Sequence, residues 1–331
     1  MSIHPTCLAR RRLASLALLA TAAATLSRPL RAADAWPSRP VRLVVPFPPG
    51  GATDTIARLI AHELQKGWQQ PVTLDHKPGA GTIVGTDAVA KAAPDGYTLG
   101  MAILSHLTNP ALQPSLPYDT LRDLAGVSQV AFTHFGVFAH PSFEARTLPE
   151  LIALAKRSPG RIAFASTGIG NGTHLTGELL EAAAGIDLVH VPYKGSAQAQ
   201  QDVVGGRVPL LIDVLASALP FVTQGRLRPI ALASPTRASV ARDIPTIAET
   251  LPGFSAVSVI GVIVAAGTPR EIVERIGADV ARAARAPDVV ERMASLGAEA
   301  VGSSPAQYDA LIRAEIEKWT RVIRAAGIRL E

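Results

Sequence analysis

Residues 41–54 read VRLVVPFPPGGATD. The first five residues, apolar except for Arg42, predict a short strand, and the prolines and glycines of residues 46–51 end it. From Ile56 onward, apolar residues recur at i, i+3, i+4 and i+8, which predicts an amphipathic helix directly after the turn. A strand, a glycine-rich turn and a helix in this order direct backbone N–H groups and the positive end of a helix dipole to one point, which suits a bound anion.

A second segment repeats this order of elements. Residues 161–165 (RIAFA) predict a strand, residues 166–172 (STGIGNG) a polar glycine-rich turn, and the residues from Thr173 onward a helix. We expect the two turns to face each other across a cleft. Residues 43–57 and 162–193 contain no Lys or Arg, so an anion there would be held by backbone N–H groups, helix dipoles, hydroxyls and waters.

The rest of the chain alternates short apolar runs with helical patterns, which indicates α/β architecture. Further strands are expected at residues 71–74, 97–102, 133–139, 188–191, 208–213, 229–233 and 258–265. Capping boxes predict the starts of three helices at residues 147–150, 268–271 and 304–307. A chain of 331 residues is long enough for two domains.

The first 35 residues have the pattern of a secretory signal peptide. Three arginines at residues 10–12 precede an uncharged apolar run at residues 13–26, which is too short to span a bilayer. Cleavage is expected after Ala32 or Ala35, and an uncleaved N-terminal anchor is the alternative. The arginines are weakly similar to a twin-arginine signal, so both export routes stay open.

This segment also carries most of the excess positive charge. The whole chain has 32 Lys and Arg against 27 Asp and Glu, a net charge of +5. Cleavage after Ala35 removes five arginines and Asp34, which leaves 27 against 26, or +1, and gives no support to nucleic-acid binding. The one cysteine, Cys7, leaves as well, so the mature chain would have no disulfide, thiolate metal site or cysteine nucleophile. Export without disulfides is compatible with the bacterial periplasm.

Other interpretations of the glycine-rich segments are weaker. Residues 79–85 (GAGTIVG) superficially resemble a dinucleotide fingerprint, but they do not follow a strand directly and the last glycine comes one residue too late. Phe164 stands where a nucleophile elbow around Ser166 requires glycine. His174 has no partner spaced to share a metal with it. We therefore expect no cofactor, no metal and no catalysis, with a hydrolase as the least supported alternative.

Several motifs in a fixed order resemble those of one protein family. They are WPSRPV (36–41), PFPPGGATD (46–54), PGAG (78–81), PDGYTL (94–99), LPYD (116–119), HLTGE (174–178), HVPYKG (190–195), IPTIAE (244–249) and AGTP (266–269). Over the whole mature chain they resemble the Bug family of extracytoplasmic solute receptors, the binding components of tripartite tricarboxylate transporters. The resemblance implies a two-lobed type II periplasmic binding protein fold, a Venus flytrap that closes on a small mono-, di- or tricarboxylate. It also implies that main-chain N–H groups of the two turns hold a carboxylate group.

The resemblance assigns ligand-binding residues to three segments. These are Phe47, Pro49, Gly51, Ala52 and Asp54 in the first loop, Ser166, Thr167, Gly168, Gly170, Thr173 and His174 in the second, and Tyr193, Lys194, Gly195 and Asp213 on the other wall. For Asp54, which lies in a first helical turn, complementing the helix dipole is favoured over ligand contact. We expect replacement of Gly51 or Gly168 by a bulky residue to abolish binding without destabilising the protein.

The expected layout is a signal peptide at residues 1–35, a first lobe of residues 36–134 and 260–331, and a second lobe of residues 135–259. Three departures from the family pattern concern the cleft: residues 75–77 read DHK instead of the usual ENR, Thr82 stands where glycine is common, and Ser258 where an aromatic residue is frequent.

These observations predict a periplasmic, non-catalytic receptor that acts as a monomer and delivers a small carboxylate to the membrane permease of a tripartite tricarboxylate transporter. A sensory role, in which the closed form docks on the periplasmic domain of a sensor kinase, is the alternative, and both are compatible with the sequence.

Overall fold

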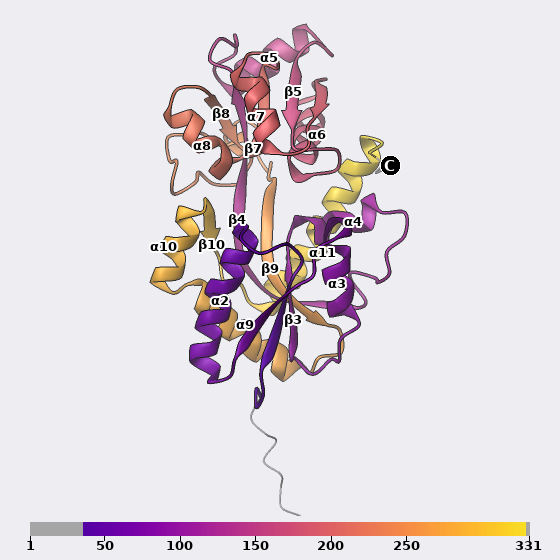
Figure 1. The fold of residues 1–331 in the computed structure, drawn as a ribbon. Coiled ribbons are helices and arrows are strands. Elements are labelled where there is room, and N and C mark those ends of the chain that lie inside the picture. Colours follow the sequence, from indigo (N-terminus) through magenta and orange to yellow (C-terminus); the bar gives the residue numbers. More distant parts are fainter. Residues whose placement is uncertain (1–35, 329–331) are drawn as a thin grey trace, which may run out of the picture. The chain divides into compact units, whose positions relative to one another are not determined.

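The computed structural model describes residues 36–328, whose strands and helices are arranged as shown in Figure 1. The expected signal peptide and its cleavage sites lie outside the described residues. Within the described part, none of the helices combines the length and the apolarity that a bilayer-spanning segment needs.

One part of the sheet has the strand order β2-β1-β3-β9-β4, with β10 also paired to β4. The strands are β1 (Val41–Val45), β2 (Val72–His76), β3 (Thr98–Ala102), β4 (Leu124–Ala139), β9 (Val257–Ala265) and β10 (Ala298–Ala300). β1 runs parallel to β2 and β3, whereas β9 is antiparallel to both β3 and β4. This arrangement places the carboxyl ends of β1, β2 and β3 at one edge, where the first predicted turn begins.

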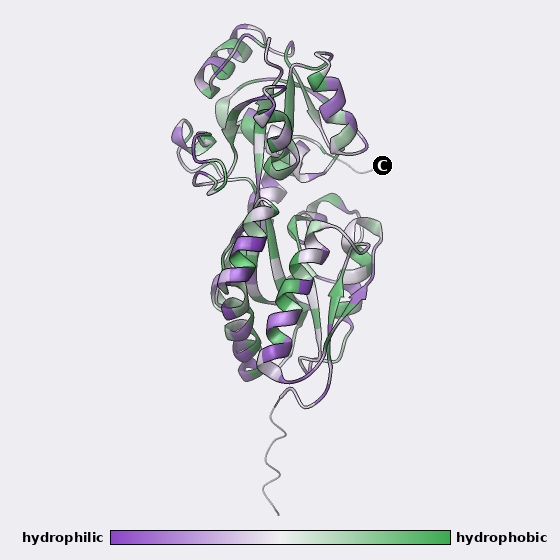
Figure 2. Ribbon diagram, turned by 60° about the vertical axis from the view of Figure 1, so that its left-hand side comes forward, coloured by the Kyte–Doolittle hydropathy of each residue, from purple (hydrophilic) through white to green (hydrophobic). Residues whose placement is uncertain are grey.

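The helices that belong with these strands pack apolar stripes against them. They are α2 (Ala52–Trp68), the 3₁₀ turn η1 (Ala80–Thr82), α3 (Ile83–Ala90), α4 (Leu104–Leu112), α9 (Arg270–Ala284), α10 (Pro287–Ser295) and α11 (Pro305–Ala325). α2 packs on β1, β2 and α9, and α11 packs on α4, β4 and α6. Figure 2 shows the expected pattern of amphipathic helices, which alternate hydrophilic and hydrophobic residues, around strands that are mostly hydrophobic.

The other part of the sheet continues from β4 in the order β4-β7-β5-β6, with β8 also paired to β4. Its further elements are α5 (Leu148–Arg157), β5 (Ala163–Ser166), α6 (Gly172–Ala184), β6 (Val189–Pro192), α7 (Ser196–Val204), β7 (Leu210–Val214), α8 (Leu215–Thr223), β8 (Arg228–Leu232) and the 3₁₀ turn η2 (Ile247–Glu249). β5 is parallel to β6 and β7, and β4 is antiparallel to β7. The second predicted strand–turn–helix unit is therefore β5 followed by α6.

Strand β4 joins the two parts of the sheet. It pairs with β9 as far as His134 and with β7 from Phe135 onward. The sequence predicted only residues 133–139 of this strand. Register shifts near Gly126 and Gln129 interrupt the alternation of buried and exposed residues that makes a strand recognisable. The lobe boundaries expected at 134/135 and 259/260 remain a proposal.

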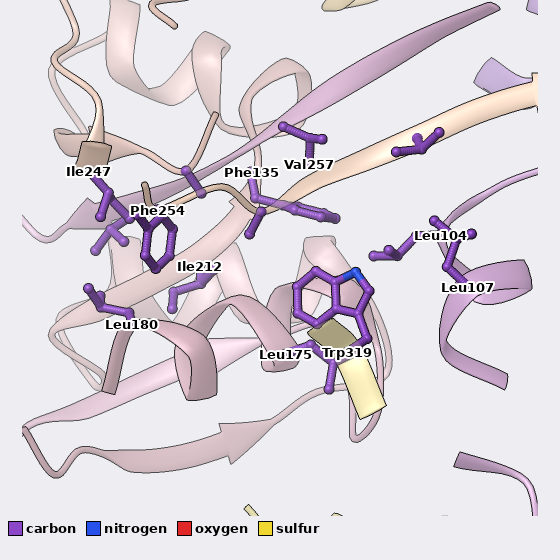
Figure 3. Close-up of a cluster of buried hydrophobic side chains, with 14 of the residues drawn as sticks. Leu104, Leu107, Phe135, Leu175, Leu180, Ile212, Ile247, Phe254, Val257 and Trp319 are labelled. Carbon is purple, nitrogen blue, oxygen red and sulfur yellow. The ribbon is translucent and has the colours of Figure 1, made fainter. Parts of the chain in front are cut away.

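A single apolar cluster connects elements that are distant in the sequence (Figure 3). Trp319 of α11 is fully buried in this cluster together with Leu175 of α6, Phe135 of β4 and Leu104 of α4. Leu175 lies three residues after the start of α6, so the helix that carries the second turn is anchored in the core directly behind that turn.

All three predicted capping boxes lie at helix starts, and two of them have the expected side-chain cap. Thr147 accepts the Glu150 N–H at the start of α5, and Ser304 forms a full box at the start of α11. The prediction for residues 268–271 is wrong as a box, because α9 is capped by Pro269 without a side-chain bond. The Thr268 hydroxyl instead donates to the Ala265 carbonyl at 2.7 Å, closing the turn that precedes the helix.

Candidate ligand-binding site

The first predicted turn ends in a helix start with free N–H groups. Gly51 is the N-cap of α2 with an extended backbone, and the first helical hydrogen bond is donated by Thr55 to the Gly51 carbonyl at 3.0 Å. In the part of the chain that the structure describes, the N–H groups of Ala52, Thr53 and Asp54 have no acceptor. Ala52 is exposed, so an anion can reach these donors.

Asp54 supports this turn from behind. Its side chain is buried; Oδ2 accepts the Gly50 N–H at 2.8 Å and Arg58 Nε at 3.0 Å, and Oδ1 lies 2.7 Å from His76 Nε2. Burial raises the pKa of Asp54, but the hydrogen bonds from Gly50, His76 and Arg58 outweigh it and bring the pKa to about 2. Both carboxylate oxygens are occupied by the protein, so Asp54 shapes the turn and is closed to a ligand in this arrangement.

The other predicted residues of the first loop surround this helix start. Phe47 is half-buried, and Pro49 is exposed beside Gly50 and Gly51. His76 of β2 contacts Asp54, so this residue acts on the shape of the first loop.

The N–H groups of the second turn are bound by side chains of the turn itself. The Gly168 N–H donates to Ser166 Oγ at 3.2 Å. The Gly170 N–H donates to His174 Nδ1 at 3.1 Å. Both glycines have positive φ, +132° and +74°, a conformation that favours glycine. Their amides are thus engaged inside the turn, contrary to the expectation that they hold the ligand.

Threonine and asparagine side chains complete the internal bonding of this turn. Thr173 Oγ1 accepts the Thr167 N–H at 2.9 Å and lies 2.8 Å from Thr167 Oγ1. The Asn171 N–H donates to the Gly168 carbonyl at 3.3 Å, and the Asn171 side-chain amide donates to the Thr167 carbonyl at 2.9 Å. The turn is a rigid, self-bonded loop.

In the second strand–turn–helix segment, the N–H groups without an acceptor follow the loop and lie in the first turn of α6. The first helical hydrogen bond runs from the Leu175 N–H to the Asn171 carbonyl at 3.0 Å. Across residues 36–328, no acceptor faces the N–H groups of Gly172, Thr173 and His174. Within the described chain, the starts of α2 and α6 therefore share one arrangement, in which a closed loop is followed by helix-start amides without an acceptor.

Two histidines stack beneath the second turn. The rings of His174 and His190 are 3.8 Å apart with an angle of 9° between their planes, and His190 stacks on Phe164 at 5.0 Å. Ser166 Oγ lies 2.6 Å from His190 Nε2. Burial, and then the neighbouring His174, lower the pKa of His190 to about 4, although Glu178 acts in the opposite direction. The sequence contains no local signal that pairs His190 with His174.

A cavity of about 480 Å³ opens beside the start of α6. Its lining includes five of the predicted ligand residues, Thr167, Thr173, Lys194, Gly195 and Asp213, together with Phe135, Asn171, Gly172, Ser196 and Val214. No residue of the first loop belongs to this lining. That the two turns face each other remains a prediction.

Two of the residues predicted for the other wall are bonded within the protein. Asp213 is fully buried and accepts hydrogen bonds at 2.8 Å each from Ser196, Gln200 and the Val214 N–H, while its burial raises its pKa. The Tyr193 hydroxyl donates to Asp202 at 2.7 Å, and burial together with that carboxylate raises the pKa of Tyr193 to about 12. Tyr193 and Asp213 therefore brace the wall.

Lys194 is exposed and supplies the one cationic side chain among the residues that line the cavity. Its side chain forms no ion pair with any described residue. Gly195 beside it is the N-cap of α7, whose first helical bond, from the Ala199 N–H to the Gly195 carbonyl, spans 3.4 Å. Among residues 36–328, no group of three His, Cys, Asp or Glu side chains is placed to hold a metal ion.

Several known proteins are similar to this chain over most of its length. The protein BugT of Bordetella pertussis is 38% identical over 305 residues, covering 90% of this chain and 93% of that protein. Among solved structures, a protein of R. palustris with adipate is 34% identical, with a TM-score of 0.73, covering 89% of this chain and 100% of that one. MatC of Rhodopseudomonas palustris with bound malate is 33% identical, with a TM-score of 0.69, covering 87% of this chain and 100% of that one.

These similarities confirm the fold as that of two-lobed periplasmic solute-binding proteins, which are receptors and not enzymes. The family model of the tripartite tricarboxylate transporter family receptors matches residues 56–328. The relatives named Bug and the matched family agree with the family resemblance that was inferred from the sequence motifs. The chain belongs to the tripartite tricarboxylate transporter receptor family.

Proposed function

We propose that this protein is a monomeric periplasmic receptor that binds a small carboxylate and delivers it to the permease of a tripartite tricarboxylate transporter. Its family and the relatives with adipate and malate support this proposal. We expect the N-terminal segment to be removed after Ala32 or Ala35 during export, and sequencing the N-terminus of the periplasmic protein tests that step.

The observation that carries the proposal is the pair of helix starts with unpaired N–H groups. Three consecutive N–H groups at α2 and three at α6 have no acceptor among residues 36–328, and neither turn contains a cationic side chain. Backbone donors aligned with a helix dipole stabilise a carboxylate without the desolvation cost of burying an arginine beside it. These amides support the proposal that a carboxylate binds at the two helix starts toward which the predicted turns lead.

The cavity beside α6 favours a ligand with two polar ends. Lys194 and the start of α7 line this cavity together with the start of α6. If one carboxylate group of a ligand bound the α6 amides, the other end of that ligand would lie near the Lys194 side chain. Dicarboxylates such as the malate and adipate of the two relatives have this chemistry.

Calorimetry on the mature protein, unfolded and refolded to remove bound metabolites, tests the proposal. The panel consists of mono-, di- and tricarboxylates, each with its neutral amide as the matched control. We expect saturable one-to-one binding of at least one carboxylate and none of its amide. Silence across the whole carboxylate panel would overturn the proposal. Loss of uptake on deletion of the gene, restored by the intact chain, tests delivery to a permease.

A further inference from the structure

His174 was expected to touch the ligand, but its ring lies inside the protein and is bonded on both edges. We propose that His174 is a positioning residue, whose neutral ring holds the second turn closed so that the first amides of α6 stay open to the carboxylate. This inference rests on the proposed function for its purpose, whereas the geometry it invokes exists without a ligand.

The hydrogen bonds define the protonation of the His174 ring. The Gly170 N–H is a donor, so His174 Nδ1, 3.1 Å away, must be the unprotonated acceptor. The proton of the neutral ring then lies on Nε2, which donates to Glu178 Oε1 at 3.1 Å. The His174 side chain is buried, so little water is available to replace either bond.

The groups around the ring hold its orientation. Glu178 on α6 faces the edge of the His174 ring, and His190 on β6 covers the face of that ring. Ser166 on β5 is in turn hydrogen-bonded to the His190 ring. Two imidazolium rings 3.8 Å apart would repel each other, so at most one ring of the stack is positively charged. Burial lowers the pKa of His190 to about 4, so the ring that covers His174 is neutral near pH 7.

The bond to Gly170 determines which donors remain for a ligand. Gly170 precedes the start of α6 by two residues, and its positive φ of +74° turns its N–H toward His174 and back into the loop. If His174 took a proton on Nδ1, two N–H donors would face each other and this bond would be lost. The loop would then be free to fold over the amides of Gly172 and Thr173.

A matched pair of variants separates positioning from ligand contact. In His174→Asn the side-chain oxygen falls near the position of Nδ1 and can accept the Gly170 N–H, whereas the longer glutamine of His174→Gln extends toward Glu178. Both variants lose the stack on His190. With a carboxylate from the panel as probe, we expect His174→Gln to weaken binding about tenfold or more and His174→Asn to recover most of that loss. Equal affinities of the two variants, or stronger binding by His174→Gln, would overturn the proposal.

Measurements on the ligand-free protein distinguish a failure of the positioning role of His174 from a failure of the proposed function. Nitrogen-15 spectra of the ligand-free protein should show His174 protonated on Nε2 and not on Nδ1. Hydrogen exchange of the Gly170 amide should be slow in the wild type and in His174→Asn, and at least about tenfold faster in His174→Gln. An Nδ1–H tautomer, or a Gly170 amide that exchanges equally in all three proteins, would overturn the positioning role even if carboxylates bind.

Discussion

The carboxylate of Asp54 accepts the N–H of Gly50 at 2.8 Å, and this bond closes the loop in front of α2. The buried carboxylate is thereby bonded to the turn itself. Among the described residues, the helix-start amides of Ala52 and Thr53 have no acceptor. The second loop reaches the same result with His174 and Gly170. In both loops a side chain from the first turn of the helix binds a glycine amide four residues earlier.

Replacing Asp54 with Asn should destabilise the protein in a pH-dependent way. The pKa of Asp54 is lowered from 3.8 to about 2 in the folded state, so its contribution is present above pH 4 and is lost as the pH falls toward 2. The shift corresponds to about 2 kcal/mol of unfolding free energy at pH 7. Urea unfolding of Asp54→Asn against the wild type should show this difference at pH 7 and a smaller one at pH 3.

Asp288→Asn is the control for the helix dipole, because Asp288 also lies in a first helical turn, that of α10, but is exposed. Its cost should stay below about 1 kcal/mol at either pH. Equal costs for the two variants would contradict the role assigned to the buried carboxylate of Asp54.

Gly51→Leu should remove binding while leaving the fold intact. Gly51 has φ −80°, and a Cβ built on it meets no atom within 4 Å, so a side chain is accommodated. That side chain would stand in the exposed space before the α2 amides. We expect carboxylate affinity to fall at least about tenfold, with an unfolding free energy within about 1 kcal/mol of the wild type. Gly50→Leu, at φ +98°, is the contrast and should lose stability as well.

Gly168→Leu should lose stability together with binding, which revises the expectation that it behaves like Gly51. Its φ is +132°, and a Cβ would lie 3.0 Å from Asn171 Nδ2 and 3.3 Å from the Tyr193 carbonyl oxygen. Backbone strain of this kind costs about 1–3 kcal/mol. Thermal and urea unfolding of the ligand-free variant measure it, and a wild-type unfolding free energy would contradict the crowding seen at this turn.

Lys194→Met should affect dicarboxylates more than monocarboxylates. Lys194 is exposed at the cavity, so its charge is screened, and we expect a loss of about threefold to tenfold for a dicarboxylate that reaches it. A monocarboxylate held at the α6 amides should lose less than about twofold. Calorimetry at two salt concentrations measures both. Lys156→Met, an exposed lysine on α5 that does not line the cavity, should change neither affinity.

Much of this protein could be predicted from local patterns. The strand of residues 41–45, the helix that follows it and the helix starts at Thr147 and Ser304 were found because short-range periodicity and capping chemistry act within a few residues. The same patterns located both loops. They also overstated one capping box, at Thr268, since they do not show which acceptor a hydroxyl selects.

The sequence by itself determined the family, the α/β elements and the two helix starts toward which the loops lead. Only the tertiary structure decided which amides are free, because that depends on where the Asp54 and His174 side chains point. Asp54 is oriented partly by His76, twenty-two positions away on β2, and His174 by its stack on His190 of β6. Such orientations arise from contacts between strands and helices that fold together, and no pattern within a short stretch of sequence encodes them.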